Sequence, residues 1–519
     1  MTNQREAAWD RLARGRFDLL VIGAGIIGSR IAYEAARAGL DVALIDAGDF
    51  GGATSSGSSK LIHGGFRYLP MGDLGLVIES QRERTALMAR VAPHLVRRIP
   101  MVLAAYRGGP TAPAVAGAGV LAYGALCGFR GTGVGLVGVK GAQRLIPSLN
   151  TRGLSVCGLF DEGQTNDARL VLATVAAGID AGVIAINHAR VAALDFLSGG
   201  GALASIQGAP TEGRVEVAFT HVVNAAGASV DSVRRLEDSS SKPMARLSKG
   251  VHLLLDAPPE WRAGVVIPVE DGRVTMAIPW EGMLMLGTTD TEYVGDPAGC
   301  AVADADVAQV LAEVSVALPR EVVRPSAVRF SFAGLRVLPI GEGSTASAHR
   351  EHMVRVGPHG MVSIAGGKLT THRRIALEAL RRIDDPRLTG LALLDNALIE
   401  ASSEIGDFGA DVDPSVASHL ARVYGSDAVN VVAQRRFHSN AMERIHPDGP
   451  DVWAQAYYAV DREWAVTVDD VVRRRTTVAV RGLATAAVQS QIARAVAGGG
   501  AETARSAMPS RSRVGFAVA

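Results

Sequence analysis

The sequence predicts an α/β fold that begins with a nucleotide-binding strand–turn–helix unit. Residues 18–22 form a largely apolar run, which is typical of a strand buried on both faces. Three glycines follow the run directly, namely Gly23, Gly25 and Gly28. The apolar residues between 26 and 37 then recur at helical spacing until Gly39, and a second apolar run follows at 41–46. Strand, glycine turn, helix and second strand in this order are typical of the Rossmann-type unit.

The glycine spacing also predicts the ligand of this unit. Gly23 permits a tight turn, Gly25 lets the backbone approach a pyrophosphate, and Gly28 allows close packing of the helix on the strand. The helix N-terminus then faces the phosphates. Asp46 ends the second run, where a carboxylate can accept hydrogen bonds from ribose hydroxyls. We therefore predict a bound dinucleotide.

Two later segments favour FAD over NAD as that dinucleotide. Asn224-Ala225-Ala226-Gly227 closes a predicted strand with small residues, so a cofactor can pass close to the backbone. Residues 365–370 run from a predicted strand into a predicted helix over 368–381, whose positive end suits the negative charge of a reduced flavin. Ordinary turn chemistry remains the alternative interpretation of both segments.

Composition narrows the class of protein. Hydrophobic residues make up 48% and charged residues 20% of the 519 residues, enough to bury a core in several domains. A formal net charge of +1 offers no electrostatic case for nucleic acid as a partner. The three cysteines have no metal-ligand spacing and form no disulfide framework, so we expect no metal site and a cytoplasmic location.

Three further segments carry weaker predictions. Residues 1–16 lack the apolar core of a signal peptide. The uncharged, Ala/Gly-rich segment 112–129 is interpreted as a buried or cap-domain helix in preference to a surface that dips into a membrane near a quinone. The run Arg473–Arg475 is interpreted as a solvated helix face in preference to a phosphate or membrane contact.

Residues 54–69 are unusually dense in chemistry-bearing side chains. Hydroxyls and glycines suitable for phosphate and flavin contacts precede His63, Arg67 and Tyr68. A loop rich in hydroxyls is often only a solvated turn. Its position directly after the predicted ribose-binding strand favours a place in the active site instead.

With these motifs in view, the chain resembles the FAD-dependent, quinone-linked glycerol-3-phosphate dehydrogenases. The resemblance extends over roughly residues 17–385 in the family's order and continues into the helical tail at 469–476. It rests on eight stretches, at 22–28, 53–69, 166–170, 223–227, 249–252, 286–290 with 295–297, 333–336 and 366–371. The most specific of them is Ser58-Ser59-Lys60-Leu61-Ile62-His63-Gly64-Gly65-Phe66-Arg67-Tyr68-Leu69.

The resemblance implies a role for each matching residue. Arg67, Tyr68, Arg336 and Lys368 would bind the substrate, since a guanidinium suits bidentate contacts with phosphate. His63, His252, Lys368 and Arg336 would serve catalysis, with either histidine as the base and His63 favoured slightly. The FAD site would comprise Gly23, Gly25, Gly28, Asp46, Thr54, Ser55, Ser59, Lys60, Leu61, Ala226, Gly227, Gly367, Lys368, Leu369 and Thr370.

The resemblance also implies the architecture. We expect a Rossmann-type FAD-binding fold with an interleaved α+β substrate (cap) domain and a C-terminal helical domain. The FAD-dependent core would span 1–390, with FAD-binding parts at about 17–100, 150–245 and 325–390 and cap parts at about 101–149 and 246–324. The helical domain would span 391–500, and 501–519 would be a disordered tail.

The reaction implied is oxidation of glycerol 3-phosphate to dihydroxyacetone phosphate, with electrons passed to a quinone at the inner face of the cell membrane. A homodimer is an assembly that the sequence allows. Val337 and Phe66 replace residues usual in the family, which leaves another polyol phosphate, such as erythritol phosphate, or an unphosphorylated polyol or hydroxy acid as alternative substrates. An oxidase that uses O2 and a non-catalytic flavoprotein remain the rival functions.

Overall fold

The nucleotide-binding unit predicted from the sequence lies in a mostly parallel sheet of a computed structural model. The structure describes residues 4–66, 73–126, 133–209, 212–258, 260–340, 352–399, 408 and 412–502. The sheet order is β17 (His352–Val356), β18 (Val362–Gly366), β10 (Arg214–Asn224), β1 (Arg16–Ile22), β2 (Val42–Ile45) and β7 (Ile184–Ile186). β1, β10, β18 and β2 are mutually parallel, so their carboxyl ends meet at one edge. Ligands of open α/β sheets bind at that edge.

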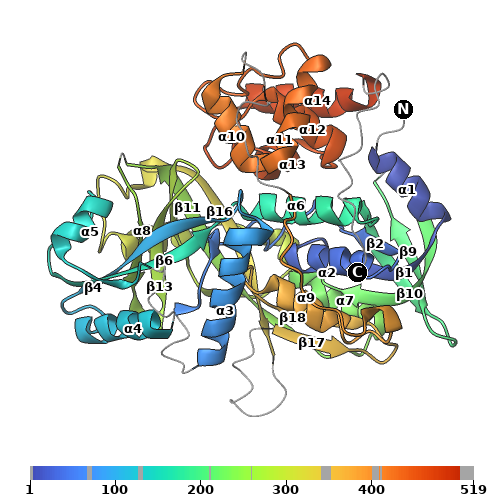
Figure 1. Ribbon diagram of the computed structural model, residues 1–519, viewed down its shortest axis with the longest axis horizontal. Coiled ribbons are helices and arrows are strands. Elements are labelled where there is room, and N and C mark those ends of the chain that lie inside the picture. Colours follow the sequence, from blue (N-terminus) through green and yellow to red (C-terminus); the bar gives the residue numbers. More distant parts are fainter. Residues whose placement is uncertain are drawn as a thin grey trace.

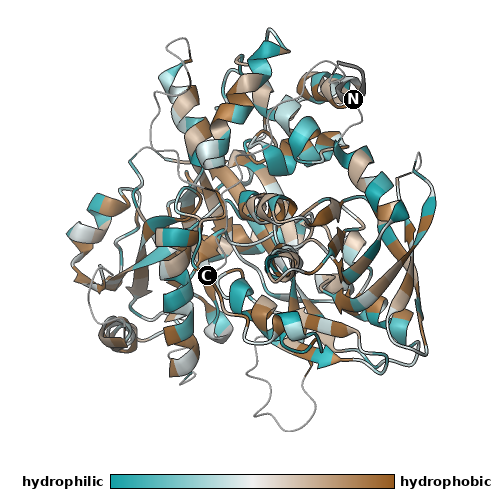
Figure 2. Ribbon diagram, turned by 45° about the vertical axis from the view of Figure 1, so that its right-hand side comes forward, coloured by the Kyte–Doolittle hydropathy of each residue, from teal (hydrophilic) through white to brown (hydrophobic). Residues whose placement is uncertain are grey.

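Both faces of β1 are buried, as its continuous apolar run predicts. Leu19 and Val21 pack on one side with α2 (Ile26–Arg37), while Leu20 and Ile22 pack on the other with β8 (Arg190–Phe196) and β9 (Ala202–Gln207). α2 is itself covered by α6 (Asp167–Asp180) and α9 (His372–Leu380). The remaining helices near this sheet are α1 (Gln4–Arg14) and α7 (Val230–Glu237). Figure 2 shows the apolar strands inside and polar helix faces outside.

A second, mixed sheet stands beside the first (Figure 1). Its order is β15 (Thr291–Tyr293), β11 (Ala245–Asp256), β14 (Met283–Gly287), β13 (Val274–Trp280), β12 (Gly264–Pro268), β4 (Arg97–Tyr106), β6 (Leu154–Gln164) and β3 (Leu61–Ile62). β16 (Val328–Pro339) pairs with β11, and β5 (Gly135–Val137) with β6. The domain boundaries expected at 150 and 325 therefore do not coincide with the division between the two sheets. β6 and β16 lie after those positions in the chain but belong to the second sheet. Strand membership depends on long-range pairing, which a local pattern does not encode.

Four helices cover the second sheet: α3 (Leu74–Ala86), α4 (Pro113–Leu126), α5 (Val139–Leu145) and α8 (Asp304–Val314). A π-helical turn at Leu87–Val91 continues α3. α4 buries Val120 and Tyr123 against the sheet, but Val115 on its other side is 65% exposed. The segment 112–129, interpreted as a buried or cap-domain helix, thus contains a helix on the second sheet that is buried on one face, and 127–129 lie outside the described residues. Within the described ranges, no helix combines the length and apolarity that crossing a membrane requires.

The C-terminal part is helical and has its own apolar clusters. It contains α10 (Pro414–Tyr424), α11 (Ala428–Val432), α12 (Trp453–Arg462), α13 (Val468–Asp470) and α14 (Ala486–Glu502). These helices sit together over α6 in Figure 1. The predicted tail at 501–519 overlaps the end of α14 at Glu502, and 503–519 lie outside the described residues.

A buried ion network joins this helical domain to the first sheet. Asp49, four residues after the end of β2, accepts a 2.9 Å hydrogen bond from Arg475 Nη2 and also pairs with Arg474. Arg474 and Arg475 are 7% and 1% exposed, so the solvated face predicted for 473–475 is wrong for both; only Arg473 fits it. The error arose because the partner carboxylate is remote in sequence.

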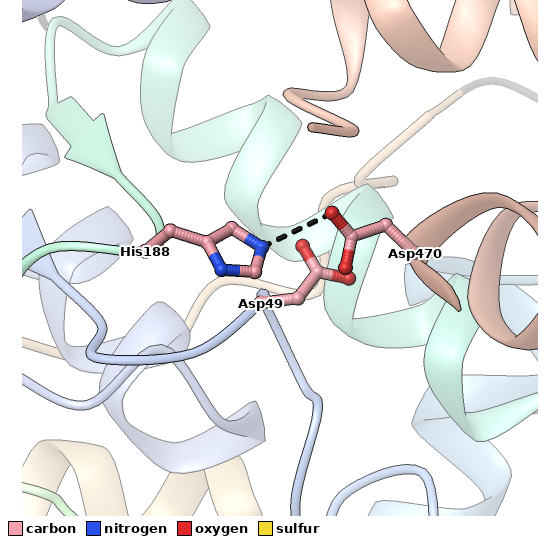
Figure 3. Close-up of side chains that lie close together, drawn as sticks. All are labelled: Asp49, His188 and Asp470. Atoms are coloured by element: carbon pink, nitrogen blue, oxygen red, sulfur yellow. Dashed lines mark hydrogen bonds and ion pairs between the residues drawn. The ribbon is translucent and has the colours of Figure 1, made fainter. Parts of the chain in front are cut away.

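His188 and Asp470 complete the network beside Asp49 (Figure 3), with 3.0 Å between His188 Nε2 and Asp470 Oδ2. Side chains of these types could ligate a metal ion, and their ligand atoms lie within 4.8 Å of one another. The two carboxylates are already paired with Arg474 and Arg475, however. We therefore interpret the cluster as an interdomain lock and not as a metal centre.

Candidate active site

A backbone cradle forms at the carboxyl edge of the first sheet. Gly23 has φ +101°, and a Cβ placed there would lie 2.6 Å from the carbonyl oxygen of Ala225 at the end of β10. A Cβ on Gly28 would lie 1.9 Å from the carbonyl oxygen of Gly23. The turn after β1, the first turn of α2 and the end of β10 thus approach one another backbone to backbone. Such spacing suits a pyrophosphate, with Gly23 in the tight turn and Gly28 at the close approach of the helix to that turn.

Polar groups line the nucleotide end of this cradle. Asp46 accepts hydrogen bonds from the backbone N–H of Ala24 at 2.6 Å and of Gly48 at 2.8 Å. Burial raises the pKa of Asp46, while these two backbone donors oppose the shift. Ser55 Oγ accepts from the backbone N–H of Ile26, at the start of α2, at 3.0 Å. Both predicted side chains therefore lie at the helix N-terminus that faces a bound dinucleotide.

The segment 366–371 forms the opposite side of the cradle. Gly366 and Gly367 have φ +78° and +103°, and a Cβ on Gly367 would lie 2.9 Å from Ile27 Cδ1 of α2. The chain forms a turn at 369–371, so α9 begins at His372 and the helix predicted from 368 is wrong by four residues. Lys368 precedes the turn, Leu369 lies in it, and Thr370 Oγ1 donates to the carbonyl oxygen of His63 at 3.3 Å.

The hydroxyl-rich loop connects the two sheets. Thr54 Oγ1 donates to the Leu335 carbonyl at 2.8 Å, and a Cβ on Gly334 would lie 2.2 Å from the Gly57 carbonyl oxygen. The loop therefore packs directly on β16. Lys60, predicted to contact FAD, anchors the loop to α6. Its Nζ lies 2.7 Å from Asp167 Oδ1, and its side chain is 5% exposed.

His252 lies on β11 next to this loop. Its Nε2 is 2.9 Å from Ser59 Oγ, and its ring stacks on Phe332 with centroids 5.0 Å apart. Burial lowers the pKa of His252 to about 3, with further lowering by the nearby charges of Lys60 and Arg336. The imidazole is therefore neutral near pH 7 and can exchange one hydrogen bond with Ser59.

Arg336 lies on β16, which pairs with the β11 strand of His252. Arg336 Nη2 donates to Thr288 Oγ1 and to the Thr289 carbonyl, both at 3.0 Å, and Nη1 donates to Asp290 Oδ1 at 3.3 Å. One third of the side chain, 33%, remains exposed. These bonds orient the guanidinium.

The described residues bring the predicted site into one region around the loop at 53–63. That loop contacts His252 through Ser59 and β16 through Gly57, and its His63 carbonyl contacts Thr370. Leu61 lies in β3, and Ala226 and Gly227 follow β10. Arg67 and Tyr68 lie outside the described residues. Asp167, Thr288 and Asp290 also belong to this region and were not predicted as site residues, although the stretches 166–170 and 286–290 contain them.

Because several histidines are buried, we expect the free energy of unfolding to fall steeply at acid pH. Burial lowers the pKa of His94 to about 4 and the pKa of His252 and His372 to about 3. The unfolded chain binds these protons near pH 6.5 and the folded chain does not, so the free energy of unfolding falls as pH drops below 6.5. The pKa of Glu162, raised to about 7 by burial, has the opposite effect between pH 7 and its ordinary value.

Three histidines opposed by one carboxyl leave a net loss of about 3 kcal/mol per pH unit between pH 6 and 5. Urea unfolding over this range measures the slope. His372→Asn, whose amide can replace the 2.7 Å bond from Nδ1 to the Leu369 carbonyl, should reduce the slope by about one proton. An unchanged slope in this variant would show that His372 is not buried in its neutral form.

Comparisons with known proteins agree with this architecture. The profile of the FAD dependent oxidoreductase family matches residues 18–373, and that of the C-terminal domain of alpha-glycerophosphate oxidase matches residues 370–499. Glycerol-3-phosphate dehydrogenase 2 of Mycobacterium tuberculosis is 32% identical, covering 92% of this chain and 83% of its own length. The probable mitochondrial glycerol-3-phosphate dehydrogenase of Caenorhabditis elegans is 33% identical, covering 90% and 68%. The solved glycerol-3-phosphate dehydrogenase of Bacillus halodurans, complexed with FAD, aligns with a TM-score of 0.72 at 28% identity, covering 92% and 89%.

Fold, cradle and comparisons together define an FAD-dependent oxidoreductase. Within this class, the chain belongs to the glycerol-3-phosphate dehydrogenase family. The predictions of the family, of the α/β fold with a C-terminal helical domain and of FAD as the cofactor are confirmed. The cradle fits FAD because its backbone segments approach so closely that a Cβ on Gly23 or Gly28 would clash with a neighbouring carbonyl oxygen.

Proposed function

We propose that the protein oxidises glycerol 3-phosphate to dihydroxyacetone phosphate and transfers the electrons to a quinone. The observation that carries the substrate assignment is Arg336, whose guanidinium is oriented by Thr288 and Thr289 and whose side chain is 33% exposed. A planar, pre-oriented guanidinium is suited to a phosphate dianion. The relatives named glycerol-3-phosphate dehydrogenase support the same substrate.

Each residue of the site is assigned one role in the reaction. Arg336 and Lys368 bind and neutralise the phosphate, together with Arg67 and Tyr68. His252 is a weak base because burial lowers its pKa to about 3, and its Nε2 already lies 2.9 Å from Ser59 Oγ. We therefore assign removal of the hydroxyl proton to His63 and orientation of the loop to His252. Bound FAD supplies the hydride acceptor.

An apolar surface on the second sheet supports the quinone as acceptor. α4 contains no charged residue, and its outer face exposes Val115, Leu121 and Leu126 at 65%, 46% and 36%. The neighbouring α3, tied to α4 by a hydrogen bond from Gln81 to Tyr123, exposes Leu74 and Ile78 at 47% and 41%. An uncharged helix face flanked by exposed aliphatic side chains suits peripheral contact with a bilayer, where quinones dissolve.

Two half-reactions test the proposal separately. Glycerol 3-phosphate added without oxygen should bleach the flavin absorbance near roughly 450 nm within seconds, because the cofactor accepts the hydride. Erythritol 4-phosphate, glycerol and glycerate serve as comparison substrates. Faster bleaching by any of these would replace the substrate assignment, and bleaching by none of the four would favour a non-catalytic flavoprotein.

The reduced protein is then mixed either with a short-chain quinone or with air-saturated buffer. Reoxidation by quinone at least tenfold faster than by O2 is expected. Rapid reoxidation in air with release of hydrogen peroxide would contradict the quinone and identify an oxidase.

A further inference from the structure

A cavity of about 420 Å³ lies between the C-terminal helical domain and the second sheet, apart from the candidate active site. One wall comes from α10 and includes Arg422, while Arg481 contributes from the segment before α14. The other wall includes His94, Arg97 and Arg169 of the core. A volume of this size accommodates a small metabolite.

The lining carries more positive than negative charge. Two of its four arginines are paired with carboxylates, Arg169 with Glu463 at 2.8 Å and Arg422 with Glu281. Arg481 donates only to a backbone carbonyl and to Thr477 Oγ1. The Arg97 guanidinium makes no hydrogen bond or ion pair in the described part of the chain. Arg97 lies at the exposed edge of the cavity. Partial burial and the neighbouring Arg422 lower its pKa to about 10, against the opposing attraction of Glu281.

His94 shows independently that the cavity is incomplete. Its side chain is only 7% exposed, and neither ring nitrogen has a hydrogen-bond partner among the described residues. Buried polar atoms are normally paired, because leaving them unpaired costs about 1–3 kcal/mol. A neutral imidazole offers one donor and one acceptor, so a ligand with both oxygen acceptors and a hydroxyl would satisfy it.

We propose that this cavity binds a small molecule bearing a phosphate group, held by Arg97 and Arg481 from opposite domains and by His94. Neither guanidinium has a carboxylate partner among the described residues, so together they match the charge of a phosphate dianion, and guanidinium groups bind phosphate with favourable geometry. The ligand bridges the core and the helical domain, so binding strengthens their association. This inference is independent of the proposed substrate.

The cavity also touches the active-site loop through one intermediate layer. Trp280 lines it and donates from Nε1 to the Thr165 carbonyl at 3.0 Å. Lys60, which holds the loop at 53–63, lies 5.4 Å from the centroid of a Trp280 ring. A bound phosphate compound is therefore positioned to alter the loop that carries Ser59 and His63.

Isothermal titration and scanning calorimetry of the FAD-loaded full chain test the proposal with inorganic phosphate against chloride at equal ionic strength. Phosphate should produce a saturable rise in Tm, because a ligand that binds only the folded state stabilises it. Arg97→Gln should weaken the apparent affinity for phosphate at least fivefold. It should not lower Tm in the absence of phosphate, because the Arg97 guanidinium makes no hydrogen bond or ion pair with the described residues that the variant would lose. Arg320→Gln, an exposed arginine outside this cavity, is the charge-matched control and should change nothing.

Phosphate could also bind at Arg336, so the titration is repeated in Arg336→Met. If the phosphate-dependent rise in Tm persists in Arg336→Met and is lost in Arg97→Gln, phosphate binds in the proposed cavity. No saturable rise, a rise lost in Arg336→Met, or a rise unchanged in Arg97→Gln would overturn the proposal.

Discussion

Gly28→Ala is expected to yield a protein that purifies without FAD. The added Cβ would stand 1.9 Å from the Gly23 carbonyl oxygen, and both atoms belong to backbone that cannot swing aside. To relieve the overlap, α2 must move away from β1, which opens the turn that faces the pyrophosphate. We expect FAD affinity to fall at least a hundredfold, measured as flavin bound per chain and by titration of the apoprotein.

Gly117→Ala is the matched control for this experiment. Gly117 is also a buried helical glycine, in α4, but its nearest contact with a new Cβ would be an ordinary 3.7 Å. This variant should keep its flavin and gain slightly in stability, since alanine favours a helix. Full flavin content in Gly28→Ala would show that the helix does not need its close approach to Gly23.

Arg336→Met is expected to lower kcat/KM for glycerol 3-phosphate about a thousandfold. Methionine fills a similar volume but removes the guanidinium, and losing one partner of a charged hydrogen-bonded pair costs about 4 kcal/mol. The much slower oxidation of glycerol, which lacks the phosphate, should change less than tenfold. Steady-state rates with both substrates at constant quinone concentration measure this difference.

Arg329→Gln is the control on the same strand. Arg329 pairs with Asp256 at 2.7 Å where both side chains are more than half exposed, at 55% and 67%. Removing a pair of this kind should leave kcat/KM nearly unchanged. Equal losses with glycerol and glycerol 3-phosphate in Arg336→Met would mean that Arg336 maintains the site's structure and does not bind phosphate.

The nucleotide-binding unit could be predicted because its determinants are local. The apolar run at 18–22, the glycines and the helical periodicity lie within 30 residues, and each acts on its immediate neighbours. The segment 366–371 shows the limit, since it contains two glycines of positive φ and a turn, and α9 begins only at His372. Periodicity alone does not reveal which glycines adopt positive φ.

The rest of the site depends on contacts between distant residues. The sequence motif places Lys60 in the predicted FAD site, yet its Nζ donates to Asp167, 107 residues later. β16 carries Arg336 to the site only because it pairs with β11, and nothing in the local sequence of 328–339 states that partner. The same is true of Arg474 and Arg475, whose carboxylate partner is Asp49.

The lock at Asp49 has a consequence for biosynthesis. During translation this carboxylate emerges 425 residues before Arg474, the first of the two arginines that neutralise it. Until then, removing Asp49 from water would leave an uncompensated charge, which costs several kcal/mol. The first-made part of the FAD-binding sheet therefore acquires its final burial only when the last-made domain docks. A nascent or truncated chain that lacks α13 and the arginines after it should keep this edge hydrated and bind FAD weakly, so the helical domain completes the maturation of the cofactor site.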